Sequence, residues 1–175
     1  VLELKVKELN RFNKKPPLNR ACPPFEDMPE LMKFLFSIQK TWAHLFIFEI
    51  LTASRQEAAR GLRWKDLDFE KKLWVISIET DKLHSQDPNK RTIVLSDKAI
   101  EYLKSLPRGK DEDLVFPLDY LITGETVPFK QSNLWKSFSR YCTKRIAEGA
   151  KGLKTDDGRF FSPHATSRST FKTWS

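Results

Sequence analysis

The feature that most constrains the fold of this chain is a nearly continuous apolar run, W-A-H-L-F-I-F-E-I-L, within residues 41–51. A helix that is apolar on every side must be covered on every side, so we expect this segment at the centre of a domain. The chain has 175 residues, enough for one domain with a substantial core. It contains no run of about 18 apolar residues, so the pattern predicts no membrane span.

Helical signals flank this run on both sides. An acidic stretch that contains Pro29 predicts a helix entrance before it. Three later helices are predicted with polar caps: residues 56–62 after Ser54, a helix from Asp97, and a long amphipathic helix from Asn133. The residues expected on the buried faces recur at helical spacing: Leu31, Phe34, Leu35, Ile38, Phe46, Phe48, Ala99, Ile100, Leu103, Leu106, Leu134, Trp135, Phe138, Tyr141 and Ile146.

Two strand-like stretches, residues 73–78 and 92–95, are separated by a polar loop and predict a β-hairpin. The fold class is therefore mainly α with a small antiparallel β-sheet, an α+β domain. Residues 1–24 contain K-K-P-P and P-P with little apolar periodicity, and they predict an interdomain linker before a domain over 25–175. This basic linker could lie as a strap on a phosphate backbone or serve as a solvated tether.

The charge balance narrows the class of partner. Thirty-one Lys and Arg residues against 23 Asp and Glu give a net charge of +8, which favours nucleic acid first and an anionic membrane surface second. Cys22 and Cys142 lie far apart in a chain without a visible secretory signal, so two reduced thiols are favoured over a disulfide. Neither their number nor their spacing suggests a zinc site.

Two arginine-centred segments carry the strongest functional signals. The first, L-T-A-S-R-Q-E-A-A-R-G-L-R-W-K-D-L-D, contains Arg55 at a predicted helix start, where free backbone N–H groups favour an anion. A guanidinium group there can hold two phosphate oxygens with parallel hydrogen bonds. The alternative for Arg55 is a structural salt bridge, for instance to Asp66 or Asp68.

The second segment, S-P-H-A-T-S-R-S-T-F-K-T-W-S, places His164 one helical turn before Arg168. An arginine at this point could stabilise the negative charge of a pentacoordinate phosphorane, and a histidine could donate to phosphate or handle a proton near neutral pH. A lone histidine is more often structural, and the adjacent arginine is what favours a functional role here.

These pieces, in this order, resemble the catalytic domain of the tyrosine recombinases, also called phage integrases. The segment around Arg55 is similar to the family's T-G-x-R start followed by L-x-W-x-D-hydrophobic-D, and H-A-T-S-R-S-T-F-K-T-W resembles its His-x-x-Arg motif followed by T-F-x-T. The resemblance runs from about Pro23 to the end. It has two departures: three residues separate His164 from Arg168 where the family has two, and Ala58 stands where the family commonly has an acid.

The resemblance implies a catalytic set of Arg55, Lys82, His164 and Arg168. Lys82, at the end of the first hairpin strand, would protonate the departing 5′-oxygen. Lys90, across the same loop, is the rival for this role, or would hold backbone phosphate together with Arg91. Both hairpin lysines could instead be ordinary surface residues. The resemblance implies no metal and no other cofactor.

The family's nucleophile is a tyrosine that follows the His/Arg motif. The three tyrosines of this sequence, Tyr102, Tyr120 and Tyr141, all precede His164. We therefore expect the chain to be a C-terminally incomplete integrase catalytic domain that binds DNA and does not cleave it.

The implied partners are double-stranded DNA attachment sites, further copies of the protein in a homotetramer on DNA, and an accessory DNA-bending protein. The implied biology is integration or excision of a phage or other mobile element in the cytoplasm of a bacterial host, with the protein at the nucleoid when bound. The alternative from a different class is a non-catalytic DNA-binding module that retains the fold. A metal-dependent nuclease is disfavoured because the sequence has no compact Asp/Glu/His cluster.

Overall fold

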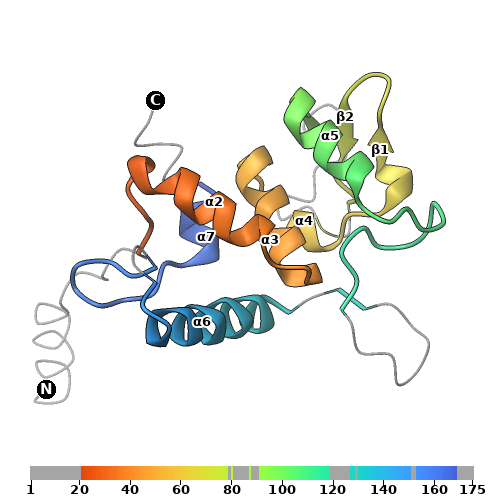
Figure 1. Cartoon of the computed structure of the whole chain (residues 1–175). Helices are drawn as coiled ribbons and strands as arrows, with labels where there is room; N and C mark the ends of the chain where they lie inside the picture. Colours follow the sequence, from red (N-terminus) through yellow and green to blue (C-terminus); the bar gives the residue numbers. More distant parts are fainter. Residues whose placement is uncertain are drawn as a thin grey trace, which may run out of the picture.

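The computed structural model describes residues 21–78, 80, 87, 91–118, 127–128, 130–150 and 153–168. Along the chain, the elements are η1 (Phe25–Asp27), α2 (Met28–Phe36), α3 (Thr41–Thr52), α4 (Gln56–Arg60), η2 (Trp64–Asp66), β1 (Leu67–Asp68), β2 (Leu73–Val75), β3 (Thr92–Val94), α5 (Asp97–Ser105), α6 (Gln131–Ala147) and α7 (Pro163–Thr166). This arrangement confirms the predicted α+β class (Figure 1).

Helix α3 is the centre of the fold, as the apolar run predicts. It contacts α2, α4, α5 and α6. Eight of its twelve residues are buried: Trp42, Ala43, Leu45, Phe46, Ile47, Phe48, Glu49 and Ile50. Figure 1 shows α3 between the sheet with α5 on one side and α2 with α7 on the other. The helix ends where Ala53 adopts a left-handed conformation with φ 48°, which turns the chain toward α4.

The sheet has three antiparallel strands in the order β1-β2-β3. Trp74 of β2 pairs with Leu67 on one side and Ile93 on the other, and its side chain is buried against Phe48 of α3. The predicted hairpin is confirmed, with strands shorter than expected. The strand β1 was not predicted, because its two residues are too few to show the alternation of apolar and polar side chains that is typical of a strand.

The predicted capping residues are wrong at three helices. Arg55, not Ser54, is the N-cap of α4. Ser96, whose Oγ accepts a hydrogen bond from the backbone N of Ala99 at 3.2 Å, caps α5, and Asp97 is its first helical residue. Helix α6 begins at Gln131, so Asn133 lies inside its first turn. In each case another residue, one position away at α4 and α5 and three positions earlier (Lys130) at α6, has the extended conformation that an N-cap needs.

Most of the predicted core residues are buried, with one clear exception. Trp135 is 49% exposed, because α6 buries the stripe of Leu134, Phe138 and Cys142, and the next residue along a helix points about 100° away from its predecessor. Both cysteines are free thiols. No helix in the described part of the chain is long and apolar enough to cross a membrane.

Candidate phosphate-binding site

Arg55 is placed by the sharp connection between α3 and α4. After the left-handed turn at Ala53, Arg55 has the extended backbone of an N-cap, with φ −75° and ψ 136°. Its neighbours in sequence, Ser54 and Gln56, are buried, whereas Arg55 itself is exposed. The local fold therefore directs this one side chain of the connection outward.

Arg168 is placed by α7 and the turn that follows it. The backbone N–H of Arg168 donates to the carbonyl oxygen of Ala165 at 3.1 Å, and the side chain is exposed. Helix α7 is held against the start of the described chain, since the backbone N–H of Ser162 donates to the carbonyl oxygen of Ala21 at 2.7 Å. The additional residue between His164 and Arg168 is accommodated as one ordinary helical turn, with Ser167 in the right-handed helical region.

The two arginines line the same small pocket, of about 170 Å³. Its other lining residues come from the α3–α4 connection, α4 and the sheet region: Ala53, Ser54, Ala58, Ile76, Thr80 and Ile93. Segments from opposite parts of the sequence thus converge on one concavity. Two guanidinium groups with small hydroxyl and apolar neighbours are suited to an oxyanion.

Neither arginine has an ion-pair partner among the described residues. The carboxylates considered as structural partners of Arg55 are engaged elsewhere. Asp66 accepts a hydrogen bond from the backbone N of Arg63 at 3.0 Å, and Asp68 accepts from the backbone N of Lys71 at 2.8 Å. The structural salt bridge considered for Arg55 is therefore not formed in the described part of the chain.

Of the other predicted site residues, those that the structure describes do not line the arginine pocket. His164 lies in α7 and is half-buried, but it is not among the residues that line the arginine pocket. Lys82 and Lys90 lie outside the described residues. Arg91, predicted to contact DNA, is described and lines a different concavity.

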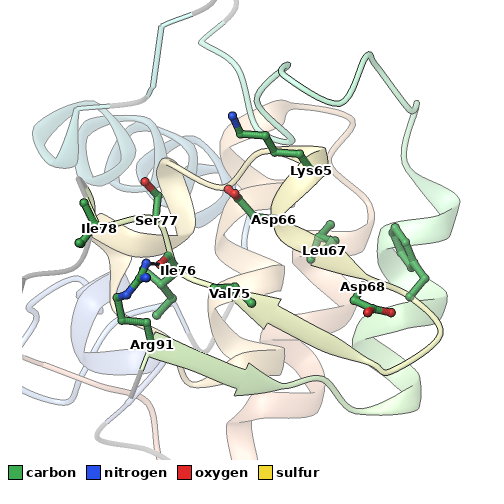
Figure 2. Close-up of a pocket in the computed structure, with 10 residues that line it drawn as sticks. Lys65, Asp66, Leu67, Asp68, Val75, Ile76, Ser77, Ile78 and Arg91 are labelled. Carbon is green, nitrogen blue, oxygen red and sulfur yellow. Dashed lines mark hydrogen bonds between the residues drawn. The ribbon is translucent and has the colours of Figure 1, made fainter. Parts of the chain in front are cut away.

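That second concavity is a wide, open depression of about 690 Å³ beside the sheet. Figure 2 shows Lys65 and Asp66 at one side and Arg91 at the other, with Val75 between them. The Nη1 of Arg91 donates to the carbonyl oxygen of Ile76, so part of this guanidinium is used within the fold. Burial raises the pKa of Asp66, although the hydrogen bond from the backbone N of Arg63 opposes the shift.

Helix α6 presents a basic surface that was not predicted from the sequence. Lys136, Arg140 and Lys144 are exposed, and their four-residue spacing places them on one face. The residues of α6 include no Asp or Glu, and none of these three cations has an ion-pair partner in the described ranges. The signal available in the sequence was this spacing of basic residues in a stretch without acids.

Together, an α+β domain and a pocket whose two arginines lack an ion-pair partner among the described residues define a protein suited to binding phosphate groups. A comparison with protein-family models matches the phage integrase family over residues 24–174. This chain therefore belongs to the phage integrase family, a family of tyrosine recombinases, and membership implies site-specific DNA recombination and DNA binding. Comparisons with curated proteins and with solved structures gave no significant match.

Proposed function

We propose that this chain supplies the phosphate-binding part of a recombinase that integrates or excises a phage or other mobile element through a 3′-phosphotyrosyl intermediate. The observation that carries the proposal is the pocket that Arg55 and Arg168 share, in which neither guanidinium has an ion-pair partner among the described residues. An unpaired guanidinium at a concave surface is free to bind an oxyanion, and two of them match the non-bridging oxygens of one phosphodiester.

The roles proposed for the side chains follow the charge changes of the reaction. A tyrosine oxygen attacks the phosphorus atom, the bond to the 5′-oxygen breaks, and that oxygen leaves as a hydroxyl after it receives a proton. Arg55 and Arg168 stabilise the negative charge that gathers on the phosphorane. His164 donates to a non-bridging oxygen or handles the tyrosine's proton, and Lys82 supplies the proton to the 5′-oxygen.

In the second half-reaction, the 5′-hydroxyl of a partner strand attacks the phosphotyrosyl bond and releases the tyrosine. The covalent intermediate keeps the energy of the phosphodiester, so the reaction needs neither ATP nor another cofactor. None of the three tyrosines of the sequence follows Arg168. We accordingly propose that this stretch by itself binds DNA without cleaving it, and that catalysis needs a tyrosine beyond the His/Arg motif.

The proposed partner is double-stranded DNA at attachment sites, held by the net charge of +8 and by the acid-free face of α6, with Arg91 and Lys90 as further backbone contacts. A homotetramer on DNA and an accessory DNA-bending protein complete the proposed assembly. We propose that it acts at the nucleoid of a bacterial host.

The test is covalent capture on a suicide substrate, a duplex with a nick that prevents religation. The full-length recombinase should form a protein–DNA adduct that survives denaturation and is removed by protease, also in the presence of EDTA. This chain alone should bind the same duplex, with affinity falling as salt rises, and should form no adduct. A full-length protein that binds specifically but never forms the adduct would instead be a non-catalytic DNA-binding module.

A further inference from the structure

Gly61 is a glycine whose backbone conformation does not require glycine. It is the C-cap of α4, with φ −93° and ψ 2°, a conformation that residues with a side chain also adopt. The reason for a glycine here is space. A Cβ atom at Gly61 would overlap the Cγ2 of Thr80, far inside the separation of about 3.5–4.0 Å at which carbon atoms pack. The missing side chain of Gly61 is therefore what allows Thr80 to pack against the end of α4.

Hydrogen bonds hold the side chain of Thr80 in the orientation that makes this contact. Its Oγ1 donates to the carbonyl oxygen of Ser77 at 3.2 Å, and its backbone N donates to the same oxygen at 3.1 Å. A β-branched side chain also has few favourable χ1 angles. A rotation that moved the methyl group of Thr80 away from Gly61 would therefore break the hydrogen bond of its hydroxyl group.

The contact between Gly61 and Thr80 connects α4 with the wall of the arginine pocket. Thr80 lines this pocket together with Arg55 and Arg168. Arg55 is the N-cap of α4 and Gly61 is its C-cap, and a rise of about 1.5 Å per residue places the two caps only about 9 Å apart. Thr80 thus contacts one end of this short helix and lines the pocket at which the arginine of the other end lies.

We propose that Thr80 is a positioning residue: with its methyl group seated on Gly61, it fixes the width of the pocket in which Arg55 and Arg168 hold one phosphate. The inference rests on the proposed function of that pocket. The hydroxyl proton of Thr80 is already donated to Ser77, so the residue contributes a fixed wall and not a further donor. A shift of about 1 Å at a reacting centre can cost about a hundredfold in rate, so displacement of this wall should slow cleavage far more than it weakens DNA binding.

The experiment moves one methyl group across this contact in the full-length recombinase. Gly61→Ala adds a methyl group on the side of α4, Thr80→Ser removes one from the pocket wall, and the double variant does both and so conserves the volume. Single-turnover adduct formation on the suicide substrate should slow about ten- to a hundredfold in Gly61→Ala and about three- to tenfold in Thr80→Ser. The double variant should cleave within about threefold of the parent, because the added methyl group occupies the space that the serine leaves.

A second readout and a control separate positioning from a general loss of structure. The Kd for an uncleavable duplex should change by less than about twofold in all three variants, and the Tm of each shows that it is folded. Gly109→Ala is the matched control, since a Cβ atom at Gly109 would lie 2.7 Å from the Oδ2 of Asp113, in an exposed loop that does not line the pocket. This variant should cleave like the parent. Equal slowing in Gly109→Ala and Gly61→Ala would overturn the proposal.

The outcomes for the pocket and for the contact are distinguishable. If Arg55→Ala and Arg168→Ala cleave like the parent, the proposed function of the pocket has failed and the inference falls with it. If both are inactive and folded Gly61→Ala cleaves like the parent, the inference alone is wrong. A double variant as slow as Gly61→Ala would also overturn it, because the added methyl group would then act at another place. Should Gly61→Ala not fold, Thr80→Ser decides: slower cleavage with an unchanged Kd supports the proposal, and a parental rate contradicts it.

Discussion

Two groups of basic residues in this molecule differ in what surrounds them. Near the sheet and α5, each of five cations lies within ion-pair distance of a carboxylate: Lys65 with Glu112, Lys71 with Asp68, Lys72 with Asp97, Lys98 with Glu101, and Arg108 with Asp111. We call these the paired set. The unpaired set is a group of five exposed cations at the arginine pocket and on α6 that have no such partner in the described ranges: Arg55, Lys136, Arg140, Lys144 and Arg168.

The difference shows why net charge alone does not locate a binding surface. A cation already beside a carboxylate gains little from a phosphate, because the carboxylate repels the new anion and the local field is partly cancelled. An unpaired cation gains the full interaction and releases a counterion from the DNA. Each group adds five positive charges to the sum that gives +8, yet of these two groups only the unpaired set is expected to act on DNA.

The largest effect is expected at the pocket. Arg55→Ala and Arg168→Ala in the full-length recombinase should each lower the rate of adduct formation about a hundred- to a thousandfold, because each removes a preorganised donor to the phosphorane. The measurement is single-turnover cleavage of a suicide substrate, with the Tm checked for each variant.

Arg91→Ala is the matched control for these variants. Arg91 is also an arginine beside Ile76, but its guanidinium donates to a backbone carbonyl and lines the other concavity. Its loss should change the cleavage rate by less than about tenfold. Equal losses in all three variants would mean that the place of an arginine, in the shared pocket or hydrogen-bonded to the backbone beside the other concavity, does not decide its effect on the cleavage rate.

A smaller effect is expected on DNA binding. The triple variant Lys136→Ala/Arg140→Ala/Lys144→Ala should weaken binding of this chain to duplex DNA about ten- to a hundredfold near 0.1 M salt. It should also reduce the steepness of log Kd against log salt by about 1 for each DNA phosphate that the variant no longer neutralises. Fluorescence anisotropy at several salt concentrations measures both quantities.

Its control, Lys65→Ala/Lys72→Ala/Lys98→Ala, removes the same charge from the paired set. If the two triple variants weaken binding equally and share one salt slope, only total charge matters, and the distinction between the two sets is wrong.

The sequence predicts the centre of this fold better than its edges. Helix α3 and the β2–β3 hairpin follow from strong apolar patterns, since burying that many side chains allows few arrangements. Capping residues depend on differences of about 1 kcal/mol between neighbours, which is why Ser54 and Asn133 were misassigned. Trp135 was misassigned because adjacent residues on a helix face different directions, and the buried stripe passes through Leu134.

The candidate site depends on tertiary packing, which local sequence patterns do not specify. No local pattern brings Arg55 and Arg168 to one pocket; that proximity follows from the packing of α4, α7 and the sheet, and in the sequence only the family resemblance indicated it. Glu49 illustrates the same limit. Its place in an apolar run indicated burial, but only the fold shows that neither of its carboxyl oxygens has a hydrogen-bond partner among the described residues.

The carboxylates allow the comparison to be tested by pH. In the paired set, Lys72 lowers the pKa of Asp97, so that pair stabilises the fold above the usual range of an aspartate and the contribution is lost on acidification. The pKa shift of Glu49 has the opposite sign to that of Asp97. Its folded pKa lies above the unfolded value of 4.5, so the parent loses stability as pH rises from about 4.5 through the folded pKa.

Glu49→Gln cannot titrate and should escape this loss. The stability of the variant relative to the parent should therefore increase with pH, by at most about 1.4 kcal/mol per pH unit, a factor of about ten in the folding equilibrium. Urea unfolding of both proteins between about pH 4.5 and about pH 8 gives the difference directly. Ile47→Val provides the baseline, since its stability difference from the parent should not vary with pH; the same flat difference for Glu49→Gln would contradict the raised pKa.

The smallest effect is expected on stability at Trp135, which lies on the helix that carries three members of the unpaired set. Trp135→Ala should change the free energy of unfolding by less than about 0.5 kcal/mol, because the side chain is half exposed. Trp74→Ala, at a tryptophan that is 1% exposed, should cost about 3–5 kcal/mol in the same urea titration. If Trp135→Ala also weakens DNA binding while the fold is unaffected, the acid-free face of α6 binds DNA through an aromatic contact as well as through charge. A loss of stability comparable to that of Trp74→Ala would instead place Trp135 in the core and remove it from the DNA-binding surface.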